Sequence, residues 1–246
     1  MSASGAISYT WRLARALCNP QILLTSHIFK EDSSGNLSFI GDFEGFYKNE
    51  QDPWGQSGGD KRMKSNYAFS RRNLLKEIDF LIKQKDRGKD ILEIGCGLGH
   101  VSAYLSAKLH YDCSITGMDI SPTAIAKAKA NFPHLSFSVG DICSDTFVVN
   151  EKFDIVILSE ILWYILGQLG QAFDNVEKLL KTKGVLIISN TFIDEQKYGK
   201  EIVDGFDGLV RYVVINHWSK FKIIKAQVDY FSKRLHHSSL LLLQKK

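Results

Sequence analysis

The 246-residue chain has few cysteines and few prolines, four of each. Cys18, Cys96, Cys113 and Cys143 form no C-x-x-C pair and have no histidines nearby at ligand spacing. This scatter argues against a disulfide framework and against a zinc site, so we expect no bound metal. A reducing, cytoplasmic compartment fits such cysteine usage best.

Long apolar runs and blocks of like charge are also missing. The longest aliphatic block, Leu240 to Leu243, is only as long as a strand, whereas a membrane-spanning helix needs about 18 or more apolar residues. The 31 basic and 27 acidic residues are interspersed and give a net charge of +4. The sequence therefore predicts neither a membrane span nor a nucleic-acid partner.

Acidic residues are absent from the first thirty positions, where Arg12, Arg15 and Lys30 stand among several serines and threonines. This composition is weakly typical of a transit peptide, but the arginines interrupt the only apolar stretch, which excludes a secretory signal. Tyr9 to Leu17 could equally form a short helix on a larger domain. We interpret residues 1–42 as an extension that is either a cap or a presequence.

The chain does have 44% hydrophobic and 11% aromatic residues, enough to build one sizeable core. Residues 32–59 are rich in Gly, Ser, Asn and Asp and predict ordered loops whose aromatic residues pack or bind. From Met63 to Ile82 apolar residues recur at helical spacing, which predicts an amphipathic helix. We assign residues 43–85 to a cap or lid over a main domain of residues 86–246.

The main domain alternates short apolar runs with amphipathic segments, which is the pattern of consecutive βαβ units. The last two runs are separated only by a polar turn and predict an antiparallel hairpin. The expected fold is α/β: a seven-stranded, mostly parallel sheet with an antiparallel C-terminal strand, helices on both faces and an N-terminal helical cap. The predicted strands are Asp90–Ile94, Ser114–Asp119, Leu135–Val139, Phe153–Ser159, Gly184–Asn190, Phe221–Phe231 and Ser238–Lys245, with helices near Val101–Lys108, Thr123–Asn131, Gly170–Leu180 and Leu209–Trp218.

A glycine-rich loop, Glu93-Ile94-Gly95-Cys96-Gly97-Leu98-Gly99, stands between the first of these strands and a helix. Glycines there allow positive φ and let a ligand approach main-chain N–H groups at the helix start. A nucleoside-type cofactor is the ligand that this position favours. The dinucleotide fingerprint G-x-G-x-x-G fails, because its last position is His100 counted from Gly95 and Ser102 counted from Gly97.

Two carboxylates follow the next two strands. Asp119 comes twenty residues after Gly99, where a carboxylate can accept two hydrogen bonds from a ribose diol. Asp141 is placed to accept from an adenine amino group while Ile142 packs on the ring. The alternatives are a helix cap for Asp119 and turn chemistry for Asp141. Open α/β sheets bind ligands at the ends of their strands, so the loop and both carboxylates together are more specific than any one of them.

This combination of glycine loop, Asp119 and Gly140-Asp141 resembles the class I S-adenosylmethionine-dependent methyltransferases, from about Ile91 to the C-terminus. The resemblance implies a Rossmann-like fold and S-adenosyl-L-methionine as cofactor, which leaves as S-adenosyl-L-homocysteine. The cofactor-binding residues that it implies in the main domain are Glu93, Gly95, Cys96, Gly97, Gly99, Asp119, Ile120, Asp141, Ile142 and Ser159.

Two further stretches narrow the resemblance: Tyr47…Asp52-Pro53-Trp54-Gly55…Tyr67…Ser70-Arg71-Arg72, and Ser159-Glu160-Ile161-Leu162-Trp163-Tyr164. Both are similar to the nodulation protein S type, which N-methylates an amino sugar at the end of a chito-oligosaccharide. The resemblance implies that Trp54, Tyr67 and Arg71 line a closure over the cofactor. One of Arg71 and Arg72 could pair with the methionine carboxylate, or each could lie on a solvated helix face.

Methyl transfer is an in-line displacement that needs positioning and the exclusion of water rather than a covalent nucleophile. A general base near the methyl group would help, and Glu160, after the fourth strand, is the first candidate. The alternative is a carboxylate that caps the following turn. Tyr164 could stack on adenine or form a wall of the acceptor pocket, or it could belong to the core.

The sequence thus predicts a methyltransferase that acts on an amino or hydroxyl group of a saccharide or similar small metabolite, as a monomer or homodimer. One alternative is a methyltransferase of a macromolecule or a non-catalytic partner subunit. A less favoured alternative is an NAD-type oxidoreductase on a related fold, which the failed fingerprint argues against.

Overall fold

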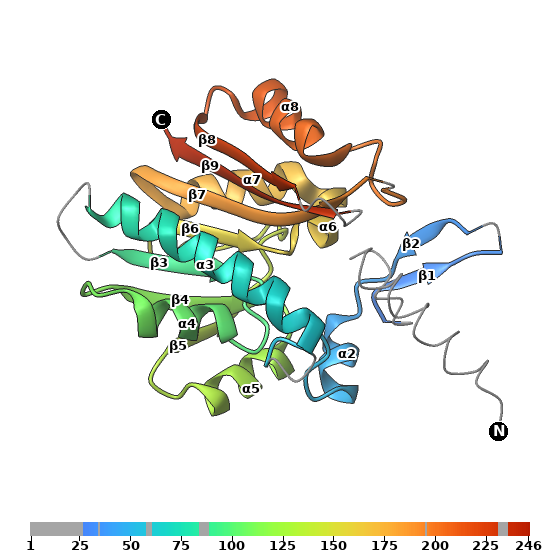
Figure 1. Cartoon of the computed structure of the whole chain (residues 1–246), viewed down its shortest axis with the longest axis horizontal. Helices are drawn as coiled ribbons and strands as arrows, with labels where there is room; N and C mark the ends of the chain where they lie inside the picture. Colours follow the sequence, from blue (N-terminus) through green and yellow to red (C-terminus); the bar gives the residue numbers. More distant parts are fainter. Residues whose placement is uncertain (1–26, 34, 58–60, 84–88, 195, 231–235) are drawn as a thin grey trace.

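The computed structural model describes residues 27–246 apart from 34, 58–60, 84–88, 195 and 231–235 (Figure 1). The predicted helix Tyr9–Leu17 lies outside these residues, so the choice between a cap and a presequence is open for most of residues 1–42. Within the described residues, no helix is both long and apolar enough to cross a bilayer. The same part of the chain holds no cluster of three or more His, Cys, Asp or Glu side chains arranged for a metal ion.

A seven-stranded sheet forms the centre of the molecule, in the order β5-β4-β3-β6-β7-β9-β8 (Figure 1). Its first five members are parallel: β3 (Asp90–Ile94), β4 (Ser114–Asp119), β5 (Ser136–Val139), β6 (Phe153–Ser159) and β7 (Leu180–Ile193). β9 (His236–Lys245) is antiparallel to both of its neighbours, β7 and β8 (Phe221–Tyr230). The predicted Rossmann-like α/β sheet with an antiparallel C-terminal strand is confirmed. Because the strand order reverses between β3 and β6, ligands are expected at the carboxyl ends of these two strands.

The strands β3, β4 and β6 begin and end where the sequence predicts, because their mostly apolar runs stop at Gly95, Asp119 and Glu160. β7 extends beyond the predicted Gly184–Asn190, since its pairing with β9 continues as far as Ile193 opposite His236. A pattern of apolar residues marks what is buried, whereas the length of a strand reflects how far its backbone pairs.

Helices cover both faces of the sheet (Figure 1). α3 (Lys61–Lys83), α4 (His100–Lys108) and α5 (Pro122–Asn131) lie on one face. The predicted amphipathic helix is α3, whose Leu74, Ile78 and Ile82 repeat every four residues and are fully buried. The other face is covered by α6 (Leu162–Ile165), the 3-10 turn η2 (Leu166–Gln168), α7 (Leu169–Leu179) and α8 (Gly205–His217).

The segment before α3 differs from the ordered loops that its composition predicts. It contains a hairpin of β1 (Phe29–Glu31) and β2 (Leu37–Phe39), followed by the helix α2 (Phe43–Asn49). Strands of three residues are too short to show alternation in the sequence, and Asp42 caps α2 by accepting from Gly45 N at 2.8 Å. The aromatic residues of this segment do pack, as expected, in one cluster with Phe29 and Phe46 at its centre.

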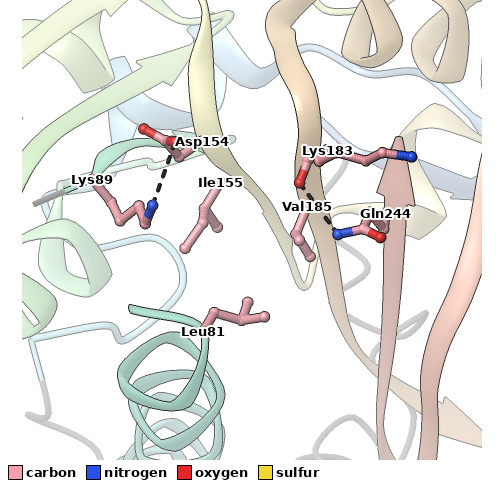
Figure 2. Close-up of a pocket in the computed structure, with 7 residues that line it drawn as sticks. All are labelled: Leu81, Lys89, Asp154, Ile155, Lys183, Val185 and Gln244. Atoms are coloured by element: carbon pink, nitrogen blue, oxygen red, sulfur yellow. Dashed lines mark hydrogen bonds and ion pairs between the residues drawn. The ribbon is translucent and has the colours of Figure 1, made fainter. Parts of the chain in front are cut away.

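At the opposite end of the parallel strands, two aspartates and two lysines join β3, β6 and β7. Lys181 Nζ lies 2.5 Å from Asp90 Oδ2 and 2.8 Å from Asp154 Oδ2. The buried Lys89 ammonium points toward Asp154 and lies 3.6 Å from Oδ1, beside a small cavity that Leu81, Ile155, Val185 and Gln244 also line (Figure 2). This network lies at the amino ends of the strands, so it supports the sheet rather than the ligand-binding edge.

Candidate cofactor and acceptor site

The glycine loop leaves β3 with left-handed backbone at alternate positions: φ is 72° at Gly95, 53° at Gly97 and 80° at Gly99. A Cβ at Gly95 would lie 2.4 Å from Ile161 Cγ2, and one at Gly97 would lie 2.5 Å from the Tyr47 hydroxyl oxygen. Conformation and space therefore both require glycine here. Gly99 is the N-cap of α4, so the loop presents a helix N-terminus, whose free N–H groups favour electron-rich ligands.

Glu93 and Cys96 support this loop from inside the protein. The Glu93 carboxylate is buried and its Oε2 accepts from Ser102 N at 2.8 Å and Ser102 Oγ at 2.5 Å, which ties β3 to the first turn of α4. Burial raises the pKa of Glu93 to about 7. Cys96 is 1% exposed and packs against Ile125 and Phe137, so its side chain points into the core. A cofactor contact by either residue stays a prediction, and for Cys96 it would come from the main chain.

Asp119 connects the carboxyl end of β4 to the glycine loop. Its Oδ2 accepts from Gly97 N at 2.8 Å and its Oδ1 accepts from Ser121 N at 2.9 Å. The side chain is 6% exposed, and burial raises its pKa. The Ile120 N–H also lowers the pKa of Asp119 by hydrogen bonding, and the four lone pairs of the carboxylate still leave room for a further donor, so the residue can hold the loop and bind a hydroxyl group at the same time.

The predicted adenine contacts lie after β4 and β5. Ile120 is 46% exposed, which is unusual for an isoleucine in this position and leaves an apolar surface for a flat ring. Asp141 Oδ1 accepts from Cys143 N at 2.8 Å, which is the turn chemistry considered above, and its second oxygen accepts no hydrogen bond from the residues that the structure describes. Ile142 is only 4% exposed and packs in the core, so the structure gives it little surface to offer a ring.

The three predicted cap residues come together over the glycine loop. Trp54 Nε1 donates to the Tyr47 hydroxyl at 3.0 Å, and the Tyr67 hydroxyl donates to Trp54 O at 2.8 Å. Arg71 Nη2 donates to Gln56 O at 3.0 Å, and its guanidinium carbon lies 5.4 Å from the centre of the Tyr67 ring. α2, α3 and the loop between them thus contribute to one wall, and its closure over the cofactor stays a prediction.

Buried polar atoms of this wall are left without partners. Among the described residues, neither Arg71 Nε nor Gln56 Oε1 has a hydrogen-bond partner. Gln56 lies against the glycine loop, since its Oε1 would be 3.1 Å from a Cβ placed on Gly97. Arg71 lies close enough to His100, directly after the loop, that its charge adds to burial in lowering the pKa of His100. An unpaired guanidinium N–H beside a helix N-terminus fits a ligand that carries a carboxylate.

Glu160 lies at the carboxyl end of β6, next to Ser159, which is partly exposed there. Its Oε2 accepts from Thr191 N at 2.9 Å and its Oε1 accepts from Thr191 Oγ1 at 3.0 Å. Burial raises the pKa of Glu160 to about 7. Ile161, the next residue, packs against Gly95, so Glu160 is held within one residue of the glycine loop.

Tyr164 is the centre of an aromatic enclosure beside Glu160. Its ring lies 5.6 Å from Trp54, 5.4 Å from Phe43 and 6.4 Å from Phe39, measured between ring centres. Burial raises its pKa, and the charge of Glu160 adds to this effect. Tyr164 therefore joins the β1–β2 hairpin and α2 to the end of β6, where it can form a wall of an acceptor pocket.

Several residues of the site were not identified from the sequence. Glu44 and Tyr47 lie on α2 and Thr191 lies on β7, and none of the three was given a role in the site. Tyr47 belongs to the N-terminal stretch that narrows the resemblance, and its 3% exposure and position against Gly97 now give it a place in the site. Glu44 and Thr191 carry no local signal, because only their tertiary contacts bring them to Ser121 and Glu160.

These residues fit S-adenosylmethionine. The glycine loop permits close approach, Asp119 has lone pairs for a ribose diol, and Arg71 has a free N–H for the methionine carboxylate. A doubly wound sheet with this loop at its switch point, without the dinucleotide fingerprint, is typical of the class I S-adenosylmethionine-dependent methyltransferases. The profile of the methyltransferase domain family matches residues 85–227, and the chain belongs to that family.

Comparisons with known proteins agree with this class. Nodulation protein S of Azorhizobium caulinodans is 29% identical over 144 residues, which are 57% of this chain and 63% of that protein. Ribosomal protein L11 methyltransferase of Dictyoglomus turgidum is 34% identical over 116 residues, 46% of this chain and 36% of that enzyme. The aligned region thus spans less than two thirds of either relative.

Solved structures show the same fold. The N-methyltransferase NodS from Bradyrhizobium japonicum WM9, in complex with S-adenosyl-L-homocysteine, matches with a TM-score of 0.60 and 21% identity, covering 82% of this chain and 97% of NodS. The CurJ carbon methyltransferase matches with a TM-score of 0.62 and 15% identity, covering 84% of this chain and 62% of CurJ. At these identities the likeness concerns the fold alone.

Proposed function

We propose that the chain transfers a methyl group from S-adenosylmethionine to the amino group of a small acceptor, of the amino-sugar type. The observation that carries the proposal is the partly buried Glu160 carboxylate, whose pKa desolvation raises to about 7, within one residue of the glycine-loop contact. The similarity to nodulation protein S and to the N-methyltransferase NodS supports an amine acceptor.

Proton affinity favours an amino group over a hydroxyl group. An alkylammonium has a pKa near 10.4, so proton transfer to a base of pKa about 7 costs roughly 4–5 kcal/mol. A hydroxyl group resembling water, with a pKa near 15.7, would cost about 12 kcal/mol. Glu160 is therefore strong enough to prepare an amine for attack, and an alcohol would need a stronger base.

Each part of the site has a separate task in this proposal. Asp119, Arg71 and the glycine loop hold the cofactor, whose sulfonium supplies an electrophilic methyl group: the C–S bond breaks, its electron pair stays on sulfur, and an N–C bond forms. Glu160 takes one proton from the acceptor ammonium, which frees the nitrogen lone pair. Tyr164 and Trp54 exclude water and offer ring faces to the apolar side of a sugar.

The test is transfer of radiolabelled methyl from S-adenosylmethionine to a panel of acceptors. The panel pairs a chito-oligosaccharide with a free terminal amine against its N-acetylated form, and adds phenols, ribosomal protein L11 and an acyl carrier protein. Label on the free amine alone supports the proposal. Label on the phenol or acetylated sugar would refute amine transfer, and label on a protein would favour the macromolecular alternative.

Isothermal titration calorimetry distinguishes a wrong acceptor class from a site that does not bind the cofactor. Binding of S-adenosylhomocysteine without methylation of any member of the panel would leave the donor site supported and reject the proposed acceptor class. No binding of either form of the cofactor would reject the proposed activity itself.

A further inference from the structure

The backbone of Glu160 adopts a conformation that residues with side chains rarely adopt. Its φ is 58°, in the left-handed region that glycine occupies without strain. Glu160 N donates to Ser189 O at 2.8 Å, so pairing with β7 maintains this conformation. A glutamate that is held in a strained backbone conformation at a strand end indicates that the orientation of its carboxylate matters for function.

Thr191 is the residue that receives this carboxylate. Its N–H and its hydroxyl each bind a different oxygen of Glu160, at 2.9 and 3.0 Å. Thr191 is itself fixed, because Trp163 Nε1 donates to Thr191 O at 3.2 Å and Asn190 Nδ2 donates to the same oxygen at 2.9 Å. The carboxylate is thus held in one plane, with one lone pair on each oxygen still open.

Among the described residues, the two titratable groups coupled to Glu160 are phenols that carry no charge at neutral pH. The phenol of Tyr67 faces it from α3 and that of Tyr164 from α6, and burial raises the pKa of both phenols. Burial raises the pKa of Glu160 as well, whereas the N–H and the hydroxyl of Thr191 both lower it. Within the described residues, the two bonds from Thr191 are therefore the main stabilisation of the charged carboxylate.

We propose that Thr191 is the positioning residue of the methyl-transfer reaction, which aims the Glu160 carboxylate at the acceptor and stabilises it in the charged form that accepts the proton. This inference rests on the proposed function, in which Glu160 is the base. Thr191 itself touches neither the acceptor nor the cofactor; it acts through Glu160.

The test compares Thr191→Val, which has nearly the same shape but no hydroxyl, with Thr191→Ser, which keeps the hydroxyl. Thr116→Val in β4 is the matched control, because it makes the same change in a partly buried strand position away from Glu160. The titration of Glu160 is followed by carbon-13 NMR of glutamate carboxyl groups in the full chain, and Glu160→Gln assigns the resonance. The pH profile of kcat/KM is measured on the same variants.

With Thr191→Val, we expect the titration midpoint and the acid limb of the profile to move up by about one pH unit, because one bond that favours the charged form is lost. kcat should fall about tenfold while KM changes little. Thr191→Ser should restore both midpoints, and Thr116→Val should leave them unchanged.

An unchanged NMR midpoint in Thr191→Val overturns the inference, whatever happens to the rate. An equal shift in Thr191→Val and Thr191→Ser overturns it too, because the effect would then come from packing. Full turnover by Glu160→Gln would instead reject Glu160 as the base, and with it the catalytic role of Thr191. Thermal unfolding of each variant identifies any that fails to fold, and Thr191→Ala then replaces Thr191→Val.

Discussion

Glu44 in α2 accepts a hydrogen bond from Ser121 Oγ at 2.6 Å, and Ser121 N donates in turn to Asp119. The same carboxylate accepts from Thr123 N at 3.1 Å and Thr123 Oγ1 at 2.7 Å, at the positive N-terminus of α5. At the other end of α2, Lys127 Nζ donates to Tyr47 O at 2.6 Å. α2 is therefore attached at both ends to the helix that follows the proposed ribose-binding residue.

Replacing Glu44 tests whether this attachment supports cofactor binding. We expect Glu44→Gln to weaken S-adenosylhomocysteine binding by about 3- to 10-fold, because the hydrogen bonds from Ser121 and Thr123 lose a charged acceptor. Isothermal titration calorimetry measures the dissociation constant. Glu50→Gln, at an exposed position just after α2, is the control and should bind like the unmodified chain. Equal binding by Glu44→Gln would show that α2 and the cofactor site are independent.

Asp119 is predicted to be the main polar anchor of the cofactor. Both of its oxygens accept main-chain N–H groups, so an amide cannot replace the carboxylate without placing an NH₂ against a donor. Asp119→Asn should weaken S-adenosylhomocysteine binding by about 1–3 kcal/mol, measured by calorimetry against exposed Asp112→Asn. An unaltered dissociation constant would mean that another residue holds the sugar.

Glu160→Gln should reduce kcat by about 10²- to 10⁴-fold and leave S-adenosylhomocysteine affinity within a factor of two. In the unmodified enzyme kcat/KM should rise as the pH passes through about 7, since only the carboxylate accepts a proton. This rise should disappear in the variant. Glu201→Gln, at an exposed position, is the control. Parallel losses of turnover and cofactor binding would contradict a role confined to the acceptor.

His217 gives a pH dependence of stability that is independent of the active site. Its ring stacks on Phe173 with centres 4.5 Å apart, and neither ring nitrogen has a hydrogen-bond partner among the described residues. Burial lowers its pKa below 6.5, so the unfolded chain binds a proton more readily than the folded chain. Stability should therefore fall as the pH drops below 6.5, until the pH reaches the lowered pKa of the folded state.

His217→Phe should reduce this fall, because phenylalanine keeps the ring contact and does not titrate. Urea unfolding at pH 7.5 and 5.5 measures the effect as the difference in free energy of unfolding between the two pH values. His134→Asn, at an exposed position, should behave like the unmodified chain. An identical pH dependence in all three proteins would show that His217 is not titrating in this range.

Asp154 is expected to matter more for stability than its neighbour Asp90. Asp154 contacts both the buried Lys89 and Lys181, whereas the half-exposed Asp90 carboxylate pairs, among the described residues, with Lys181. Asp154→Asn would leave the Lys89 ammonium buried without a counter-charge and should cost about 3 kcal/mol in the free energy of unfolding. Asp90→Asn should cost less than about 1 kcal/mol in the same urea experiment. Similar losses would show that Lys89 finds another partner.

The sequence by itself determined the strands and the helices that bury them. β3, β4 and β6 have the predicted ends because each mostly apolar run stops at a glycine or a carboxylate, and burial on both faces restricts its register. It also located the glycine loop, Asp119 and Glu160, since these residues directly follow their strands and the ends of parallel strands meet at one edge. The β1–β2 hairpin was missed, because three-residue strands carry too little pattern to distinguish them from loops.

Only the tertiary structure decided which residues complete the site. Thr191 reaches Glu160 because β6 and β7 pair in parallel, and Tyr47 reaches Gly97 because Glu44 and Lys127 attach α2 to α5. Ile142 faces the core, although its neighbour Asp141 keeps one oxygen open. The physical reason is that apolar periodicity records whether a side chain is buried, whereas the choice of partner for a polar group depends on contacts between segments far apart in the chain.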